Sequence, residues 1–388
     1  MTIVILCVAA LLCMLCITVV YGRFWLRGLS VEVKFDRAQI NEGDAVQIRE
    51  KIENRKLLPL PTLTVKFRLD REIAYVDSTN TSRTDKQYRN DCISVMPYQR
   101  VVRSFQVVGT KRGFYSVDEL DVVAMDLLYR QILTANYDNH TWLYVYPAHS
   151  RLPRLPEVVR RLYGEVITNR LLWEDPFEFK GIRDYTDSEP MRKINWKSTA
   201  RTGSLKVNQF YDTSSPRLMV FLNVEQTGVL KYEDLVEESI RIVRNVLEEF
   251  IRKGVSVTII SNGVDKLTRQ EIHLKEGVGL EHIDACLKQL ARMDIFGKVR
   301  GMDEIIREEL AHAPKEQEAV SLLLSVERSE KLAQADLEYA QASGNATWLL
   351  PIHESMTDYL AASVQENEVK RICGSKITTE YLVMERMQ

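Results

Sequence analysis

The N-terminal run of the chain constrains its fold more than any other feature. Residues Thr2 to Tyr21 carry no charge and are apolar on every face of a helix. About 20 such residues, rising ~1.5 Å each, span the ~30 Å hydrocarbon core of a bilayer. Lipid cannot satisfy an open backbone, so the run predicts one transmembrane helix over residues 2–22.

The residues on either side of this run indicate its orientation. A cleaved signal peptide would have a basic region before the apolar run, but no Lys or Arg precedes it. Arg23 and Arg27 follow the run. Because basic residues favour the cytoplasmic side, we expect a single-pass protein of the cell membrane with a cytoplasmic body. The six cysteines form no disulfide framework, which suits a reducing compartment. A net charge of -2 argues against a general nucleic-acid binder.

The first part of the body, residues 30–148, alternates apolar and polar side chains. Val31, Val33 and Phe35 show the pattern, and so do later runs up to Tyr146. Such alternation turns one face of each strand toward a core. Turn residues such as Asn41 to Asp44 separate the runs, so this region predicts an antiparallel β-sandwich.

The last part, residues 212–388, alternates strands with helices. Expected strands cover 218–222, 255–260, 320–326, 347–352 and 376–384, and expected helices cover 232–252, 280–293, 302–312 and 330–342. This order predicts an α/β domain with a mainly parallel sheet. Between the two domains, residues 149–211 predict a linker with a short helix near 157–163 and an irregular stretch from 173 to 211.

The chain lacks the common catalytic motifs. It contains no P-loop, no G-x-G-x-x-G, no H-E-x-x-H and no G-x-S-x-G, and its six histidines are scattered. A standard nucleotide, zinc or serine-hydrolase mechanism therefore lacks its parts. We expect a protein that is not an enzyme and has no catalytic residues.

The most informative stretch lies between the two predicted domains. From Lys180 to Lys206 it carries seven basic and three acidic side chains, with Tyr185 and Trp196 as flat aromatic faces. Such a surface can bind an acidic peptide or a phosphate group. The alternative is a structural clasp, in which Trp196 packs into the α/β domain and the arginines pair with nearby acids. The pairs would join Arg183, Arg192 and Arg201 to Asp184, Asp187 and Glu189.

This stretch also resembles the signature of the bacterial "domain of unknown function 58" family, F-x-G-x-R-x-Y-x-x-x-D/E-x-x-R-x-I-x-W-x-x-[ST]-A-R. The matching residues are Phe179, Gly181, Arg183, Tyr185, Glu189, Arg192, Ile194, Trp196, Thr199, Ala200 and Arg201. With Asn195 and Lys197 they form the candidate partner-binding set. The chain departs from the family in having one membrane helix rather than two, and Asp126-Leu-Leu-Tyr129 where Asp-Pro-Phe-Gly is usual.

The resemblance implies an architecture and a class of partner, but no reaction. The C-terminal half would be similar to von Willebrand factor A domains, and the protein partner would be a MoxR-type AAA+ ATPase. Such domains bind Mg²⁺ through D-x-S-x-S after the first strand, where this chain has Asn223-Val-Glu225-Gln-Thr227. Together with Glu327, these residues form a degenerate candidate metal site, because Asn replaces the expected carboxylate.

The leading hypothesis is therefore a membrane-anchored, non-enzymatic adaptor that works with such an ATPase in a chaperone-like or envelope-related assembly and needs no cofactor. Two alternatives stay open. One is a metal-dependent hydrolase that uses Asn223, Glu225 and Glu327. The other is a binder of anionic ligands that uses the basic stretch from Lys180 to Lys206.

Overall fold

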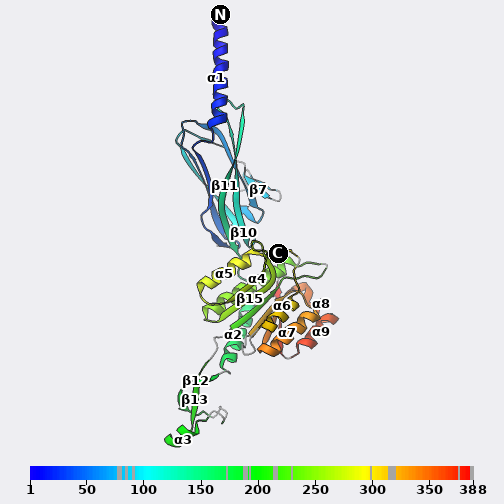
Figure 1. Cartoon of the computed structure of the whole chain (residues 1–388). Coiled ribbons are helices and arrows are strands. Elements are labelled where there is room, and N and C mark those ends of the chain that lie inside the picture. The colour runs from blue at the N-terminus through cyan, green and yellow to red at the C-terminus, as the bar shows by residue number, and fades with distance from the viewer. Residues whose placement is uncertain are drawn as a thin grey trace. The chain divides into compact units, whose positions relative to one another are not determined.

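The computed structural model divides the chain into two compact units, Met1–Ala148 and His149–Gln388 (Figure 1). It describes residues 1–76, 81–83, 86–89, 92–171, 174–186, 191, 194–212, 217–228, 230–297, 299–312, 320–374 and 376–384. Residues 149–211, expected to be a linker, belong to the second unit. Each unit is described separately below.

The first unit begins with helix α1, Thr2–Phe24. Among the described residues it is the one helix that is long and apolar enough to cross a membrane. Its residues from Thr2 to Cys16 are exposed, whereas Tyr21 is buried. The Tyr21 hydroxyl donates to the carbonyl of Pro59 at 2.9 Å, and Trp25, just past the helix, is also buried. The end of the helix therefore packs into the β-strands that follow it.

Two sheets make up the rest of this unit, and the predicted β-sandwich is confirmed at this level. One sheet has the order β1-β3-β9-β5, and the other has the order β2-β11-β10-β4-β7-β6 with β8 paired to β4. The strands of the first are β1 Leu29–Phe35, β3 Ala45–Asn54, β9 Arg100–Gly109 and β5 Ile73–Tyr75. Those of the second are β2 Gln39–Asn41, β11 Ile132–Tyr146, β10 Gly113–Met125, β4 Leu60–Asp70, β7 Lys86–Arg89, β6 Thr81–Arg83 and β8 Cys92–Val95.

The alternation in the sequence explains how the two sheets share one core. In β3, every second residue from Val46 to Asn54 is buried. Ile48 and Ile52 of this strand join Leu63 and Val65 of β4 in a single buried cluster. Burying such side chains stabilises the unit by about 1.5–3 kcal/mol each. Tyr21 and Trp25 belong to the same cluster, so α1 is continuous with the core of the sandwich.

The second unit is built on one mixed sheet with the order β16-β15-β14-β18-β19-β20. Strands β14 Arg217–Asn223, β15 Ser256–Asp265, β18 Val320–Ser325, β19 Ala346–His353 and β20 Ile377–Met384 run parallel, as predicted. The sequence did not predict the antiparallel strands β16 Glu271–Gly277 and β17 Met293–Asp294. All six residues of β18 are buried, because helices cover both faces of a parallel sheet.

The helices of this unit supply that cover (Figure 1). They are α2 Leu155–Leu171, α4 Glu233–Arg252, α5 Leu280–Arg292, α6 Met302–His312, α7 Glu330–Ser343, α8 Thr357–Ala362 and α9 Val364–Cys373, with a short 3-10 turn at Glu354–Met356. Helix α2 is longer than the predicted 157–163. Its Tyr163 ring packs edge-on against Phe250 of α4, with centroids 5.7 Å apart.

The stretch expected to be irregular contains regular structure. Strand β12, Glu174–Asp184, pairs antiparallel with β13, Lys206–Asp212, and helix α3, Trp196–Thr202, lies in the connection between them. We call β12, α3, β13 and the residues between them the signature hairpin.

Candidate functional site

The signature hairpin is held together by a small set of polar contacts around α3. The Asn195 side chain caps the helix by accepting from Ser198 N at 2.9 Å, and its Nδ2 donates to Asn208 Oδ1. Thr199 Oγ1 accepts from Lys206 N at 3.0 Å. Gly203 ends the helix with a φ of 70°, a conformation that glycine adopts without strain. Several candidate residues are therefore needed for the local fold itself.

Among the hairpin side chains whose exposure the structure describes, few apolar ones are buried and larger ones are exposed. Ile194 and Val207 form a bridge and are 6% and 0% exposed. In contrast, Phe179, Ile182, Trp196 and Leu205 are between 42% and 63% exposed. Trp196 is 63% exposed, so it does not pack into the α/β domain as the clasp alternative predicted; of the residues in the arginine pairs of that alternative, Asp187, Glu189 and Arg192 lie outside the described residues. The exposed ring must be explained by something other than internal packing.

Basic side chains accompany these apolar ones. Lys197 and Arg201 are exposed on α3. The Asp184 side chain pairs with Lys206 at 2.5 Å, whereas Arg183 Nη1 donates to the backbone carbonyl of Asp184 rather than to its carboxylate. Of the other candidate residues, Gly181 and Tyr185 lie on and just after β12, and Glu189 and Arg192 lie outside the described residues.

The second candidate site lies at the carboxyl ends of β14 and β18. These are the first and the fourth of the six strands in chain order, but they lie next to each other in the sheet. The connections that follow two such strands lead toward opposite edges of the sheet. Ligands of open α/β sheets usually bind at this point. Asn223 ends β14, Ser325 ends β18, and the two side chains are joined by a 2.9 Å hydrogen bond.

The predicted metal residues do come together here, in a network of hydrogen bonds. Asn223 Oδ1 accepts from Asn262 Nδ2 at 2.8 Å and from Glu225 N at 3.0 Å. Glu327 Oε2 accepts from Thr227 N at 3.1 Å. Asn262, at the same end of β15, is fully buried and was not identified from the sequence, because no spacing links it to Asn223.

This arrangement does not fit Mg²⁺ at Asn223. A carbonyl oxygen has two acceptor positions, and both positions on Asn223 Oδ1 already receive N–H donors. The described residues contain no group of three or more His, Cys, Asp or Glu side chains placed to hold a metal ion. An amide network thus occupies the position where the resemblance would put a metal.

Glu225 is the titratable group of this edge with a perturbed pKa. Partial burial raises the pKa of its carboxyl, and the carboxylates of Glu327, Asp303 and Glu304 raise it further. Asp303 and Glu304 begin helix α6. Four acidic groups in proximity favour retention of a proton by Glu225.

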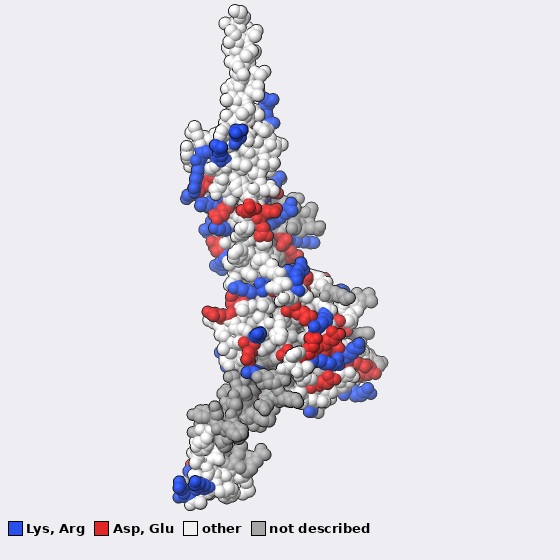
Figure 2. Space-filling model, in the orientation of Figure 1, with Lys and Arg blue, Asp and Glu red and all other residues white. Residues whose placement is uncertain are grey.

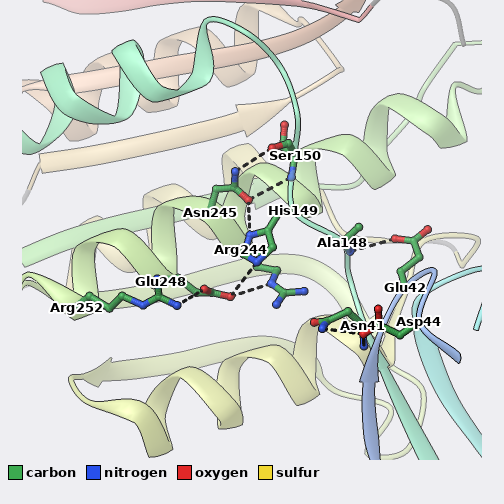
Figure 3. Close-up of polar contacts among 10 residues, drawn as sticks. All are labelled: Asn41, Glu42, Asp44, Ala148, His149, Ser150, Arg244, Asn245, Glu248 and Arg252. Carbon is green, nitrogen blue, oxygen red and sulfur yellow. Dashed lines mark hydrogen bonds and ion pairs between the residues drawn. The ribbon is translucent and has the colours of Figure 1, made fainter. Parts of the chain in front are cut away.

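A further polar cluster, missed at the sequence level, lies on α4 of the second unit (Figure 3). Asn245 accepts from Ser150 N and donates to Ser150 O, both at 3.1 Å, which fixes the start of this unit to the helix. Glu248 pairs with Arg244 and Arg252, each at 2.8 Å. Beside this cluster lies a hollow of about 320 Å³ lined by residues of α2 and α4, among them Arg160 and Lys253.

Comparisons with known proteins give one distant relative in sequence. No protein-family model matches this chain. The chain is 20% identical over 330 residues to an uncharacterized protein of Bacillus subtilis, YeaD, and the match covers 80% of this chain and 79% of YeaD. Because the matched length exceeds that of either unit, the similarity extends over both.

Solved structures match a smaller part of the chain. A non-cellulosomal cohesin from the archaeon Archaeoglobus fulgidus covers 30% of this chain and 91% of its own, with 11% identity and a TM-score of 0.22. A type II cohesin from Acetivibrio cellulolyticus covers 30% and 94%, with 12% identity and a TM-score of 0.24.

Proposed function

We propose that this chain is a membrane-anchored adaptor that binds a protein partner through the signature hairpin. The observation that carries the proposal is the exposure of Trp196 and Phe179, at 63% and 54%, on a two-stranded hairpin. A two-stranded sheet is marginally stable on its own, and exposing large apolar groups gives it no further stability. Exposed aromatic side chains of this kind are enriched at protein interfaces.

The charges of the hairpin indicate the chemistry of the partner surface. Lys197 and Arg201 are exposed on α3 beside Trp196. A partner that supplies carboxylates around an apolar pocket would pair with both kinds of group. The resemblance to the "domain of unknown function 58" family suggests the partner class, a MoxR-type AAA+ ATPase, and suggests a von Willebrand factor A-like origin for the α/β unit.

Two further observations support a non-enzymatic role at the membrane. Helix α1 has the length and composition of a membrane anchor, and the basic residues after it place the body on the cytoplasmic side in this proposal. The hydrolase alternative has less support, because Asn223 is engaged by Asn262 and by the backbone of Glu225.

The experiment is co-purification of a MoxR-type ATPase encoded in the same genome with the tagged, detergent-extracted full-length chain. We expect the wild type to retain the ATPase, and the double variant Phe179→Ala/Trp196→Ala to lose about tenfold or more, at ~1 kcal/mol or more per aromatic anchor. The matched control is Trp142→Ala, which removes a tryptophan that is 51% exposed on the sandwich.

Two outcomes would count against the proposal. If the wild type repeatedly fails to retain the ATPase, the partner class is wrong. If the double variant retains as much ATPase as Trp142→Ala, the hairpin is not the binding surface.

A further inference from the structure

Four segments of the first unit meet where α1 enters the sandwich. They are residues 22–28, 55–58, 96–100 and 127–132, and we call them the collar. Arg55 N donates to Gly28 O at 2.7 Å, and Lys56 Nζ donates to Trp25 O at 2.6 Å. Tyr98 N donates to Lys56 O at 3.3 Å. These bonds hold loops from distant parts of the sequence at the end of the helix.

The fourth segment also lies against α1. A Cβ atom at Gly22 would lie only 3.6 Å from Nε2 of Gln131, so this loop contacts the helix directly. Asp126, at the start of the loop, is fully buried and accepts from Arg130 N and Gln131 N at 2.6 and 3.1 Å. The loop is therefore a fixed structure.

The collar exposes large apolar side chains from every segment. Leu57, Tyr98, Tyr129 and Ile132 are 75%, 71%, 63% and 65% exposed. The smaller exposures of Phe24, Leu26, Met96 and Leu127 lie between 38% and 57%. Isolated exposed apolar residues are normal, but a group of them on adjoining loops marks a contact surface.

Two of these side chains are held outward by an unfavourable backbone. Tyr98 and Tyr129 have φ values of 55° and 56°, and only one other described non-glycine residue, Arg269, has a positive φ. The left-handed region costs an L-residue about 1–2 kcal/mol. Such conformations concentrate at functional sites, where the surrounding structure maintains them.

The charge of the collar is of one sign. Its segments contain six basic residues and no acidic one, namely Arg23, Arg27, Arg55, Lys56, Arg100 and Arg130. The nearest acids are turned inward or neutralised, since Asp126 is buried and Glu53 pairs with both Arg55 and Arg100. Figure 2 shows blue side chains gathered where the white helix meets the sandwich.

We propose that the collar is a bilayer-contact surface that lies among the headgroups of anionic lipids. The inference rests on the membrane anchoring in the proposed function. If the exposed part of α1 lies in the hydrocarbon core as far as the point where Tyr21 packs into the sandwich, residues 22–28 lie in the adjoining headgroup layer. Loops bonded to those residues are then at the same depth. Tyr side chains and basic groups are the residues that membrane interfaces favour, and anionic headgroups attract the net positive charge that remains after Glu53 pairs with Arg55 and Arg100.

The test uses the full-length chain in vesicles of phosphatidylcholine and phosphatidylglycerol, with lipids brominated near the carbonyl end of the acyl chains. Variants Tyr98→Trp and Tyr129→Trp each add a tryptophan at the collar. Val76→Trp is the matched control, because Val76 is 58% exposed on the same unit and its amide bonds to Gln106, six residues along β9 from Arg100. At ~3.3 Å per residue, that position is about 20 Å from the collar.

We expect bromolipid to remove about half or more of the added emission at positions 98 and 129 and little at position 76, because bromine quenches on contact and the interface holds the ring at that depth. The quenching should be weaker in vesicles of phosphatidylcholine alone. Equal quenching in both vesicles would overturn the assignment to anionic lipid.

Flotation of the vesicles separates this inference from the anchor on which it rests. Protein that floats with the vesicles but shows no more quenching at 98 and 129 than at 76 overturns the collar and leaves the anchor standing. That result would be expected if the collar binds a protein partner rather than lipid. Protein that does not float overturns the anchor and the collar together.

Discussion

Asp336 provides the sharpest test of the second unit, because its carboxyl group is buried and has no hydrogen-bond partner among the described residues. Helix α7 turns one face toward the core, with Leu332, Ala335 and Tyr339 buried. Asp336 lies on this same face and is 0% exposed. Within the described part of the chain, neither of its oxygens has a hydrogen-bond partner. Burial raises the pKa of this carboxyl from 3.8 to about 7.

The shift sets the sign of the pH dependence. Well below pH 3.8, the group is protonated in both states and its ionisation has no effect on stability. As the pH rises, the unfolded chain releases the proton first, so the unfolding free energy falls until the folded group also ionises near pH 7. Three pKa units at 1.36 kcal/mol each give a loss of about 4 kcal/mol, as an upper estimate.

The perturbation is Asp336→Asn, which has nearly the same shape and does not ionise. Hydrogen exchange of α7 and β19 amides, compared between variant and wild type at one pH, cancels the intrinsic exchange rates and reports the opening free energy of the unit. We expect the variant to be more stable than wild type by up to about 4 kcal/mol near pH 8, and by little near pH 4.

The control is Asp265→Asn, because Asp265 is equally buried but pairs with Arg292 at 2.8 Å. Removing that charge leaves the guanidinium without this carboxylate, so the control should destabilise the unit near pH 8. The reasoning would be refuted if Asp336→Asn gave no gain in opening free energy near pH 8. It would also be refuted if the gain were as large near pH 4 as near pH 8.

Three further substitutions test other parts of the structure. Arg103→Ala removes a guanidinium 2.6 Å from the buried Glu50 carboxylate, and urea unfolding of the sandwich should show a loss of about 3 kcal/mol or more. Adding Glu50→Gln to the Arg103→Ala variant should restore part of the lost unfolding free energy. Asn195→Ala removes the cap of α3. Hydrogen exchange of the amides of that helix should then be faster and should show an opening free energy lower by about 1 kcal/mol. Asn223→Ala breaks the buried bonds to Asn262 and Ser325; thermal unfolding should show a loss of about 2–3 kcal/mol, and an unchanged midpoint would contradict the network.

Most of the helices and strands could be predicted from the sequence, because their signals are local. The alternation of Val46, Ile48 and Ile52 indicates a strand with one buried face wherever that strand pairs. The wholly apolar run at Val320 likewise indicates a strand covered on both faces. The prediction failed for β16 and for the signature hairpin. Their strands carry many polar residues, so they are defined by pairing with a neighbouring strand and not by a period of their own.

The sequence by itself determined that the first helix is uncharged and long enough to span a bilayer, and that strands and helices alternate in the second half. Only the tertiary structure decided that Trp196 is exposed, that Asn262 reaches Asn223, and that three loops from distant parts of the sequence gather at the end of α1. The physical reason is range. Periodicity reports how a segment divides its own faces between apolar and polar, whereas exposure, hydrogen-bond partners and shared surfaces depend on which distant segments strand pairing brings beside it.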